Sequence, residues 1–295
     1  MRKDWKDIKS GAFQLTATLK FIVSHPLNSG RKLSALGRFT AWQVASRLRA
    51  EIEFEWIEGT KLIVSHGMTG ATGNIYCGLH EFVEMGFLLH LLRPNDLFLD
   101  VGANIGSYTI LAARVCGARV IAFEPDPGTA SVLRRNIAIN HLSALTDVRE
   151  AALGAVDGQI AFTVGLDTMN RVARPDDKSV QIVPIGRLDD IPEAAAATLI
   201  KLDVEGFEEE VLSGASRVLA SPSLLAVQSE LCSPIVQDTL ESFGFERRFY
   251  DPFTRTLQPT PFSYQTSNAL FVRATDLVKE RLAQAPSRIV GRRAL

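Results

Sequence analysis

The chain has 295 residues, of which 46% are hydrophobic and 22% charged, and its formal net charge is −1 at pH 7. Such a chain can bury a substantial core in one large domain, as a soluble enzyme does, and no second domain is required. The three cysteines are widely spaced, which excludes a disulfide framework and a zinc pattern. The sequence contains no run of 18 apolar residues, so it does not predict a membrane span.

Residues 1–50 are predicted to form a basic, helical N-terminal extension. They contain ten Lys or Arg and two Asp, a local net charge of +8, and no apolar signal core follows the first charges, so we expect a cytoplasmic protein. Apolar residues between Phe21 and Leu48 recur at partly helical spacing, which predicts helices packed on the domain or on a partner subunit. Contact with a membrane surface is the alternative, whereas no nucleic-acid module is recognised and no nucleic-acid partner is expected.

Residues 51–95 are expected to form a small hairpin and a helix that precede the main domain. Two strand-like pieces, FEWI and KLIV, predict the hairpin within residues 51–67. The helix is expected at residues 80–92, because the Arg93-Pro94 pair ends it. The main domain then covers residues 96–275, and a basic tail covers residues 276–295.

The most informative segment is LFLDVGANIGSYT, residues 97–109, a predicted strand followed by a glycine-containing turn and a helix. Gly102 and Gly106 would let the backbone turn sharply and approach a ligand, and the helix would offer free amide groups to it. The spacing is DxGxNxG and not the GxGxxG of dinucleotide sites. Asp100 would repel a pyrophosphate and attract an amino group or a sulfonium, both of which S-adenosylmethionine carries.

A second acidic residue follows the next predicted strand, residues 119–123, in ARVIAFEPDP. Glu124 at the strand end could accept hydrogen bonds from both hydroxyls of a ribose. Each of the two motifs is weak alone, since a glycine turn is often structural and an acid after a strand often caps a helix. At this spacing, together, they predict a nucleoside site.

Residues 198–215, TLIKLDVEGFEEEVLSGA, place charged side chains in a predicted buried strand, where they are costly unless paired or used. Lys201, Asp203 and Glu205 alternate with apolar residues and should point to one side. One interpretation is a Lys201–Asp203 ion pair that closes the strand end. We favour a functional role, because open α/β folds bind ligands at the carboxyl end of the sheet.

The remaining pattern alternates strands with helices, which indicates a mostly parallel sheet with helices on both faces. After the strands and loops above come a helix at 127–140, a strand near 146–152, a helix at 207–220, a strand at 224–229 and a helix at 234–243. Residues 153–190 interrupt the rhythm and predict an inserted hairpin near the site. Residues 245–250 and 268–273 predict a closing antiparallel hairpin.

Three blocks, DVGANIGSYT, FEPDP with the following LRRNIAIN, and IKLDVEGFEEEVLSGA, resemble the FkbM-type S-adenosylmethionine-dependent methyltransferases over about residues 70–272. The resemblance implies a Rossmann-like class I methyltransferase fold with a seven-stranded sheet, and O-methylation of a hydroxyl on a sugar, glycan or secondary metabolite. It implies that Asp203 faces the reacting end of the cofactor. The residues expected to bind S-adenosyl-L-methionine are Glu81, Asp100, Gly102, Ala103, Asn104, Gly106, Glu124, Pro125 and Asp203.

The chain also differs from the family in one place and agrees with it in another. Residues 165–172, GLDTMNRV, resemble a family stretch in which a histidine often follows the asparagine, and here that position is Arg171. A catalytic role for this loop is therefore doubtful. The family's strand after the DVEG block commonly ends in a glutamate, and AVQSE supplies Glu230.

Methyl transfer needs a group that accepts the proton of the acceptor. Asp203, Glu205 and Glu230 are the candidate catalytic residues, and His80 is a further candidate base. The three acids could instead hold Mg²⁺ and lower the pKa of the acceptor, but we expect no metal. Glu81 could meet the amino group of the cofactor or support the first turn of its own helix.

Two other functions are compatible with the pattern. A nicotinamide-dependent oxidoreductase shares the fold and the ribose acid, but the DxGxNxG spacing and Asp100 stand against it. A non-catalytic binding protein on the same fold would normally show an eroded cofactor loop, and here the loop is intact.

Overall fold

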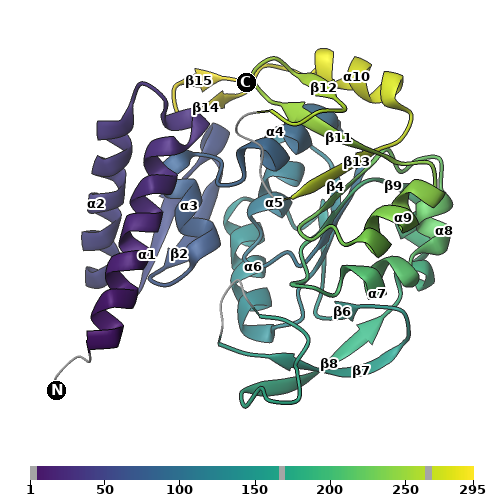
Figure 1. Cartoon of the computed structure of the whole chain (residues 1–295), viewed down its shortest axis with the longest axis horizontal. Helices are drawn as coiled ribbons and strands as arrows, with labels where there is room; N and C mark the ends of the chain where they lie inside the picture. Colours follow the sequence, from purple (N-terminus) through teal and green to yellow (C-terminus); the bar gives the residue numbers. More distant parts are fainter. Residues whose placement is uncertain (1–4, 166–169, 263–267) are drawn as a thin grey trace.

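A computed structural model describes residues 5–165, 170–262 and 268–295. Its centre is an eight-stranded sheet with the order β12-β11-β13-β10-β9-β3-β4-β5 (Figure 1). The strands are β3 (Leu97–Val101), β4 (Arg119–Phe123), β5 (Thr146–Arg149), β9 (Ala197–Leu202), β10 (Ala226–Ser229), β11 (Glu246–Asp251), β12 (Thr256–Gln258) and β13 (Ala269–Val272). The five strands from β5 to β10 are parallel, and β13, β11 and β12 add antiparallel pairs.

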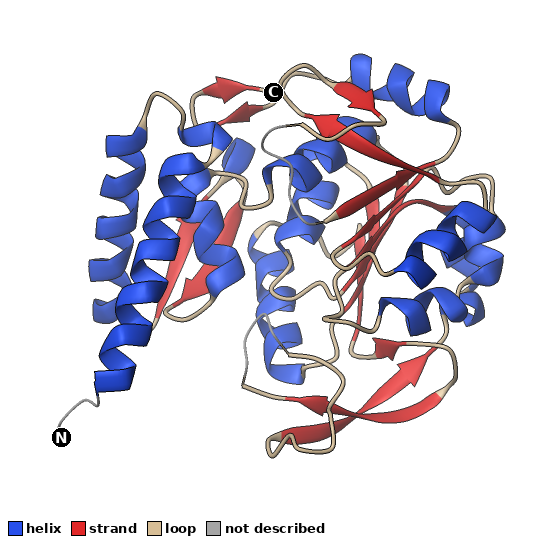
Figure 2. Ribbon diagram, in the orientation of Figure 1, coloured by secondary structure: helices blue, strands red, loops and turns tan. Residues whose placement is uncertain are grey.

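Helices cover both faces of this sheet, as the alternating pattern predicted (Figure 2). One face carries α4 (Phe82–Leu91), α5 (Ser107–Ile110) with its π-helical continuation (Leu111–Val115), α6 (Pro127–Ile139) and α10 (Thr275–Ala283). The other carries α7 (Glu208–Ser213), α8 (Ser216–Ala220) and α9 (Pro234–Ser242). Along β3, Phe98 belongs to the first core cluster, and Leu97 and Leu99 belong to the second. The period of two therefore distributes one apolar strand between two cores.

The sheet differs from the expected seven strands by one. The additional strand, β12, is three residues long and pairs with β11 at the edge of the sheet. The predicted hairpin of β11 and β13 is confirmed, since these strands pair antiparallel and β13 pairs with β10. A three-residue edge strand gives too little periodicity to be recognised in a sequence.

Two predicted elements are divided in the structure. The helix expected at 207–220 is broken between α7 and α8, where a Cβ on Gly214 would lie 2.0 Å from the carbonyl oxygen of Gly154. The strand expected near 146–152 is β5 followed by β6 (Ala152–Leu153), which belongs to a separate sheet with β7 (Gly158–Thr163) and β8 (Val180–Gly186). The predicted insertion is thus a three-stranded sheet, below the main one in Figure 1.

The N-terminal extension packs on the domain. It consists of α1 (Trp5–Ser24), a short 3₁₀ turn (Pro26–Asn28) and α2 (Lys32–Leu48), beside the hairpin of β1 (Glu51–Glu55) and β2 (Lys61–Ser65) and the helix α3 (Thr69–Cys77). Ile22, Leu27 and Trp42 are buried and belong to the same core cluster as Phe98 of β3. Contact of the extension with a membrane surface stays a prediction. None of the helices in the described ranges has the length and hydropathy that crossing a membrane requires.

The order of the strands determines where a ligand can bind. From β3 the chain moves outward to β4 and β5, and it later returns to β9 on the other side of β3. Connections therefore leave β3 and β9 in opposite directions, and a crevice opens between them at their carboxyl ends.

Replacing Trp42 by alanine should lower the free energy of unfolding by about 3–5 kcal/mol, because it removes a large buried side chain from the shared core. The matched control is Leu33→Ala in the same helix, where the side chain is 85% exposed, and its effect should stay below about 0.5 kcal/mol. Urea denaturation followed by circular dichroism measures both. Equal, small losses would show that the extension contributes nothing to the folded core.

Candidate active site

A cavity of about 280 Å³ lies at the carboxyl ends of β3, β4, β9 and β10. The predicted site residues that line it are Glu81, Gly102, Ala103, Asn104, Glu124, Pro125, Asp203, Glu205 and Glu230. The structure therefore brings together residues that are up to 149 positions apart in the chain, since Glu81 and Glu230 line the same cavity. Asp100 and Gly106 are not in the lining.

The turn after β3 is fixed by close backbone contacts. A Cβ on Gly102 would lie 1.9 Å from the carbonyl oxygen of Asp203, and φ at Gly102 is +80°. The amides of Gly102 and Ala103 donate to the carbonyl of Phe123 at 3.0 and 2.9 Å. Only glycine fits at Gly102, because the turn passes directly beneath the loop that carries Asp203.

Gly106 has a packing role and does not reach the cavity. Its φ is +94°, and a Cβ there would lie 2.4 Å from Cδ1 of Leu133. This glycine allows α5 to approach α6, and contact of its backbone with a ligand stays a prediction.

Glu124 is held at the end of β4 with both oxygens in use. Oε2 accepts from the amide of Asn104 at 2.9 Å, and Oε1 accepts from the amide of Asp126 at 2.9 Å. Burial raises the pKa of Glu124 to about 7, although both amide hydrogen bonds oppose the shift. Each carboxylate oxygen keeps a second acceptor site, so the group can take two hydroxyl donors from the cavity.

Asp100 lies behind the cavity wall. Side chains alternate along β3, so Asp100 points to the same face as Phe98, where Thr109 Oγ1 of α5 donates to Oδ2 at 2.6 Å. The carboxylate is fully buried, its Oδ1 has no partner among the described residues, and burial raises its pKa. Asp100 does not line the cavity, and its contact with a ligand stays a prediction.

A buried ion pair stands where β3 meets β9. Lys201 is the register partner of Asp100, and its Nζ lies 2.5 Å from Oδ2 of Asp203. Burial alone would lower the pKa of Lys201, but the neighbouring carboxylates, Asp203 first, outweigh it and raise the pKa above its usual value. The ion pair considered from the sequence exists, and both partners also line the cavity.

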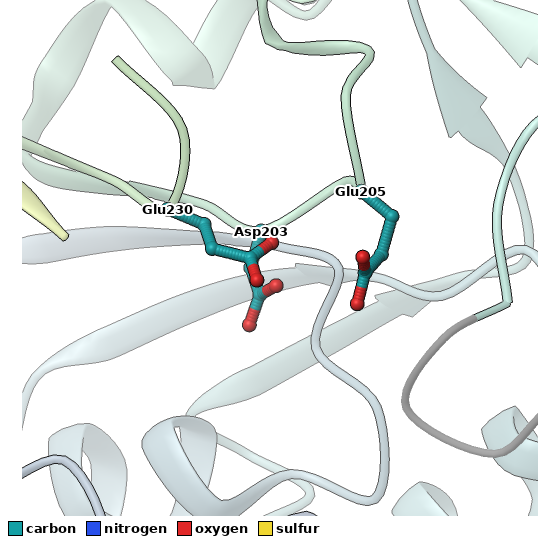
Figure 3. A group of neighbouring side chains, drawn as sticks. All are labelled: Asp203, Glu205 and Glu230. Carbon is teal, nitrogen blue, oxygen red and sulfur yellow. The ribbon is translucent and has the colours of Figure 1, made fainter. Parts of the chain in front are cut away.

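Asp203, Glu205 and Glu230 converge (Figure 3). One carboxylate oxygen from each lies within 4.8 Å of the others. Burial and the charge of Asp203 raise the pKa of Glu230 to about 8, and the pKa of Glu205 is also raised, by burial first. The raised pKa favours the protonated form of Glu230 near neutral pH. The three groups offer oxygen ligands that suit Mg²⁺, although Asp203 already binds Lys201.

Glu81 acts across the cavity and does not cap its helix. It precedes α4, but its side chain makes no capping hydrogen bond. Oε2 accepts from the hydroxyl of Tyr108 at 2.8 Å, and Oε1 accepts from Nδ2 of Asn268 at 2.9 Å. Of the two roles considered from the sequence, a capping hydrogen bond to the first turn is not formed, and contact with a ligand amino group stays a prediction.

Two further residues of the cavity carry chemistry: Tyr108, which the sequence analysis did not single out, and His80, which it named as a candidate base. The Tyr108 ring lies 4.6 Å from Nζ of Lys201, measured to the ring centroid, in addition to its bond with Glu81. His80 lines the cavity with Nδ1 unpartnered in the described structure, and burial lowers its pKa despite the nearby carboxylates of Glu81 and Asp203. The motif GSYT contains Tyr108, but nothing in the sequence shows which way its ring points.

The loop 165–172 contributes in part. Residues 166–169 lie outside the described structure. Asn170 and Val172 line the cavity, whereas Arg171 pairs with Asp177 at 2.5 Å. The residue that stands where relatives often have a histidine is therefore engaged with a neighbouring carboxylate.

The family described as "Methyltransferase FkbM domain" matches residues 100–251, just over half of the chain. Hexuronic acid methyltransferase AglP of Haloferax volcanii is 27% identical over 144 residues, which are 48% of this chain and 59% of that protein. The 31-O-demethyl-FK506 methyltransferase FkbM of Streptomyces tacrolimicus is 30% identical over 188 residues, 51% of this chain and 71% of that protein. Methyltransferase 1 of Beauveria bassiana is 28% identical over 148 residues, which are 41% of this chain and 59% of that protein.

The match thus spans 59% of the length of two of these curated relatives. Among solved structures, TYW2 of Pyrococcus horikoshii in complex with MeSAdo superimposes with a TM-score of 0.43 at 16% identity, covering 76% of this chain and 72% of that one.

Gly102→Ala should lower the free energy of unfolding by about 3 kcal/mol or more, because the new methyl group would overlap the Asp203 carbonyl. Gly67→Ala is the matched control: φ is +100° there, but nothing lies within 4 Å of the added Cβ, so only backbone strain of about 1 kcal/mol is expected. Chemical denaturation of both variants measures the difference. Similar losses would contradict the close approach.

The raised pKa of Glu230 should make stability depend on pH. The folded chain binds this proton up to about pH 8, whereas the unfolded chain releases it near pH 4.5, so the contribution is present at low pH and is lost as pH rises through this window. Glu230→Gln cannot ionise and should gain stability relative to the wild type between about pH 5 and pH 8. Denaturation curves across this range test it, with exposed Glu193→Gln as the reference. A difference that does not vary with pH would contradict the shift.

Proposed function

This chain belongs to the FkbM methyltransferase family, and on that premise we propose that it uses S-adenosyl-L-methionine to methylate a hydroxyl oxygen of a sugar, glycan or secondary metabolite. The observation that carries the proposal is the position of Glu124. Its two oxygens are each fixed by one backbone amide and face a cavity at the carboxyl end of the sheet. This arrangement suits the two hydroxyls of a ribose.

The charges in the rest of the cavity favour a cationic ligand. Glu81, Asp203, Glu205 and Glu230 line it together with a single lysine among the described lining residues, Lys201. A sulfonium and an α-amino group would find acceptors there, whereas the pyrophosphate of a dinucleotide would meet carboxylates. The cavity therefore supports the methyl donor over NAD, although its acidic lining differs from the Asp100 contact that the sequence suggested.

Glu230 is the group that we assign to receive the proton of the acceptor. S-adenosylmethionine, when bound, would supply a methyl group on a sulfonium, and an acceptor oxygen can attack the methyl carbon in line with the departing sulfur. The pKa of Glu230 is raised, and a positive charge placed beside it would lower this pKa and favour the carboxylate. Its carboxylate could then accept the hydroxyl proton as the oxygen–carbon bond forms and the carbon–sulfur bond breaks.

Asp203 and Glu205 have different roles in this proposal. Asp203 is bound to Lys201 and would orient the cationic end of the donor, so it is a weaker candidate base than Glu230. Glu205 comes from the loop after β9 and reaches the same point, where it would contribute charge. No metal is required for a carboxylate that can itself accept the proton.

The acceptor class rests on the relatives and on the apolar part of the cavity lining. Two relatives are named for a hexuronic acid and for the 31-O position of an FK506 precursor. In this chain the three-stranded sheet contributes Ala152, Leu153 and Phe162 to the cavity. An apolar wall of this kind suits the face of a sugar ring or of a polyketide.

Calorimetry with S-adenosylhomocysteine tests the donor site. The wild type should bind it, and Glu124→Ala should weaken binding about tenfold to a hundredfold by removing two charged hydrogen bonds. Glu193→Ala, at an exposed position, is the control and should bind as the wild type does. Binding of NAD with no response to S-adenosylhomocysteine would overturn the proposal in favour of an oxidoreductase.

A screen with labelled methyl donor over sugars, uronic acids and lipid-linked glycans tests the transfer. Glu230→Gln should lower the turnover number with little change in affinity for S-adenosylhomocysteine, and activity should survive EDTA. Loss of activity with EDTA would favour the magnesium alternative. Intact donor binding with no transfer to any hydroxyl acceptor would favour a binding protein.

A further inference from the structure

A second cavity, of about 520 Å³, lies outside the methyl-transfer site. It is enclosed by the loop between α1 and α2, the end of β1, the end of α3 and the C-terminal hairpin of β14 (Ile289–Val290) and β15 (Arg293–Ala294). Figure 1 shows this hairpin above the loop that joins α1 to α2, and Arg293 donates to the carbonyl of Ser29 of that loop. The two ends of the chain therefore build this cavity together.

The lining of this cavity is strongly basic. Arg31, Arg38, Arg292 and Arg293 line it with one acid, Glu55, so four positive charges and one negative charge leave a net charge of +3. None of the four arginines forms an ion pair within the described part of the chain. Like charges gathered in one cavity repel one another, and an anion would remove that cost.

Two of the arginines have structural partners and two do not. Arg38 donates to the carbonyls of Ile75 and Tyr76 at the end of α3, and burial lowers its pKa. Arg293 binds Ser29 and stacks 5.6 Å from the ring centroid of Phe253. The side chains of Arg31 and Arg292 are exposed and have no hydrogen-bond partner among the described residues. A helix-capping role thus explains Arg38 but not the gathering of the others.

The remaining lining supplies surface for more than a bare ion. Phe54 and Trp56 line the cavity, and the indole Nε1 of Trp56 donates to the carbonyl of Gly78 at 2.5 Å, which fixes the ring. Guanidinium groups bind phosphate oxygens in pairs of hydrogen bonds, and a fixed aromatic ring can pack against the organic part of the same ligand.

We propose that this cavity binds the phosphate groups of a small phosphorylated molecule, with Arg31 and Arg292 as its free ligands and Arg38 as its fixed one. The proposal stands independently of the methyl-transfer site. The two cavities share a wall, however, because Asn74 lines the second cavity while its Nδ2 donates to Ser107 Oγ and its Oδ1 accepts from the amide of His80. Ser107 and His80 line the first cavity.

Titration calorimetry of the full chain with inorganic pyrophosphate tests the site. The wild type should bind pyrophosphate, and the double variant R31E/R292E should bind it at least about tenfold more weakly, because two charge-assisted contacts become repulsive. R114E/R119E is the matched control, since it reverses two exposed arginines outside this cavity and should leave the affinity unchanged. Unchanged melting temperatures show that the variants are folded.

A second arm identifies the source of the phosphate. Vesicles of phosphatidylglycerol and phosphatidylcholine are sedimented with the same three proteins at low salt. If the wild type and the control bind pyrophosphate and R31E/R292E does not, the ligand is a soluble phosphorylated molecule. If the wild type and the control bind only the vesicles and R31E/R292E does not, the phosphate belongs to a lipid headgroup. Equal binding by R31E/R292E and the wild type, or no binding in either arm, overturns the proposal.

Discussion

The buried ammonium group of Lys201 is the constraint on which the site depends. A charge placed between β3 and β9 must be paired, and Asp203, Asp100 and Glu81 surround it electrostatically. Its partner Asp203 sits in the loop whose carbonyl lies against Gly102. The ion pair holds the loop after β9, the Asp203 carbonyl of this loop packs against the glycine turn after β3, and Asn104 of that turn donates to Glu124.

The same excess of carboxylates raises the pKa values of the site. Several acids share a confined space with one lysine, so burial and the charge of Asp203 raise the pKa of Glu230. The pKa of Glu124, farther along the sheet edge, is raised by burial, and two amide donors oppose the shift. An excess of carboxylates of this kind favours a cation over an anion in the cavity.

The ends of the chain belong to the fold in a way that its motifs do not indicate. Trp42 of the extension and Leu282 of α10 are buried in the same core cluster as Phe98 of β3, and β14 and β15 close over the loop before α2. The basic residues of both ends then gather around one cavity. A net charge near zero for the whole chain conceals this local accumulation of arginine.

The sequence by itself determined the central parallel strands and the donor motifs, because both depend on neighbours in the chain. Short apolar runs located β3 and β4 to the residue, and the glycine turn and Glu124 follow those strands directly. Tertiary structure alone decided what distant residues do. Asp100 accepts a hydrogen bond from Thr109, and Glu81 accepts one from Asn268, which is 187 positions away. Arg31 and Arg292 line the same cavity because the two ends of the chain pack together. A local pattern states which residues are charged or flexible, whereas the contacts that direct each side chain arise only from packing between elements that are remote in sequence.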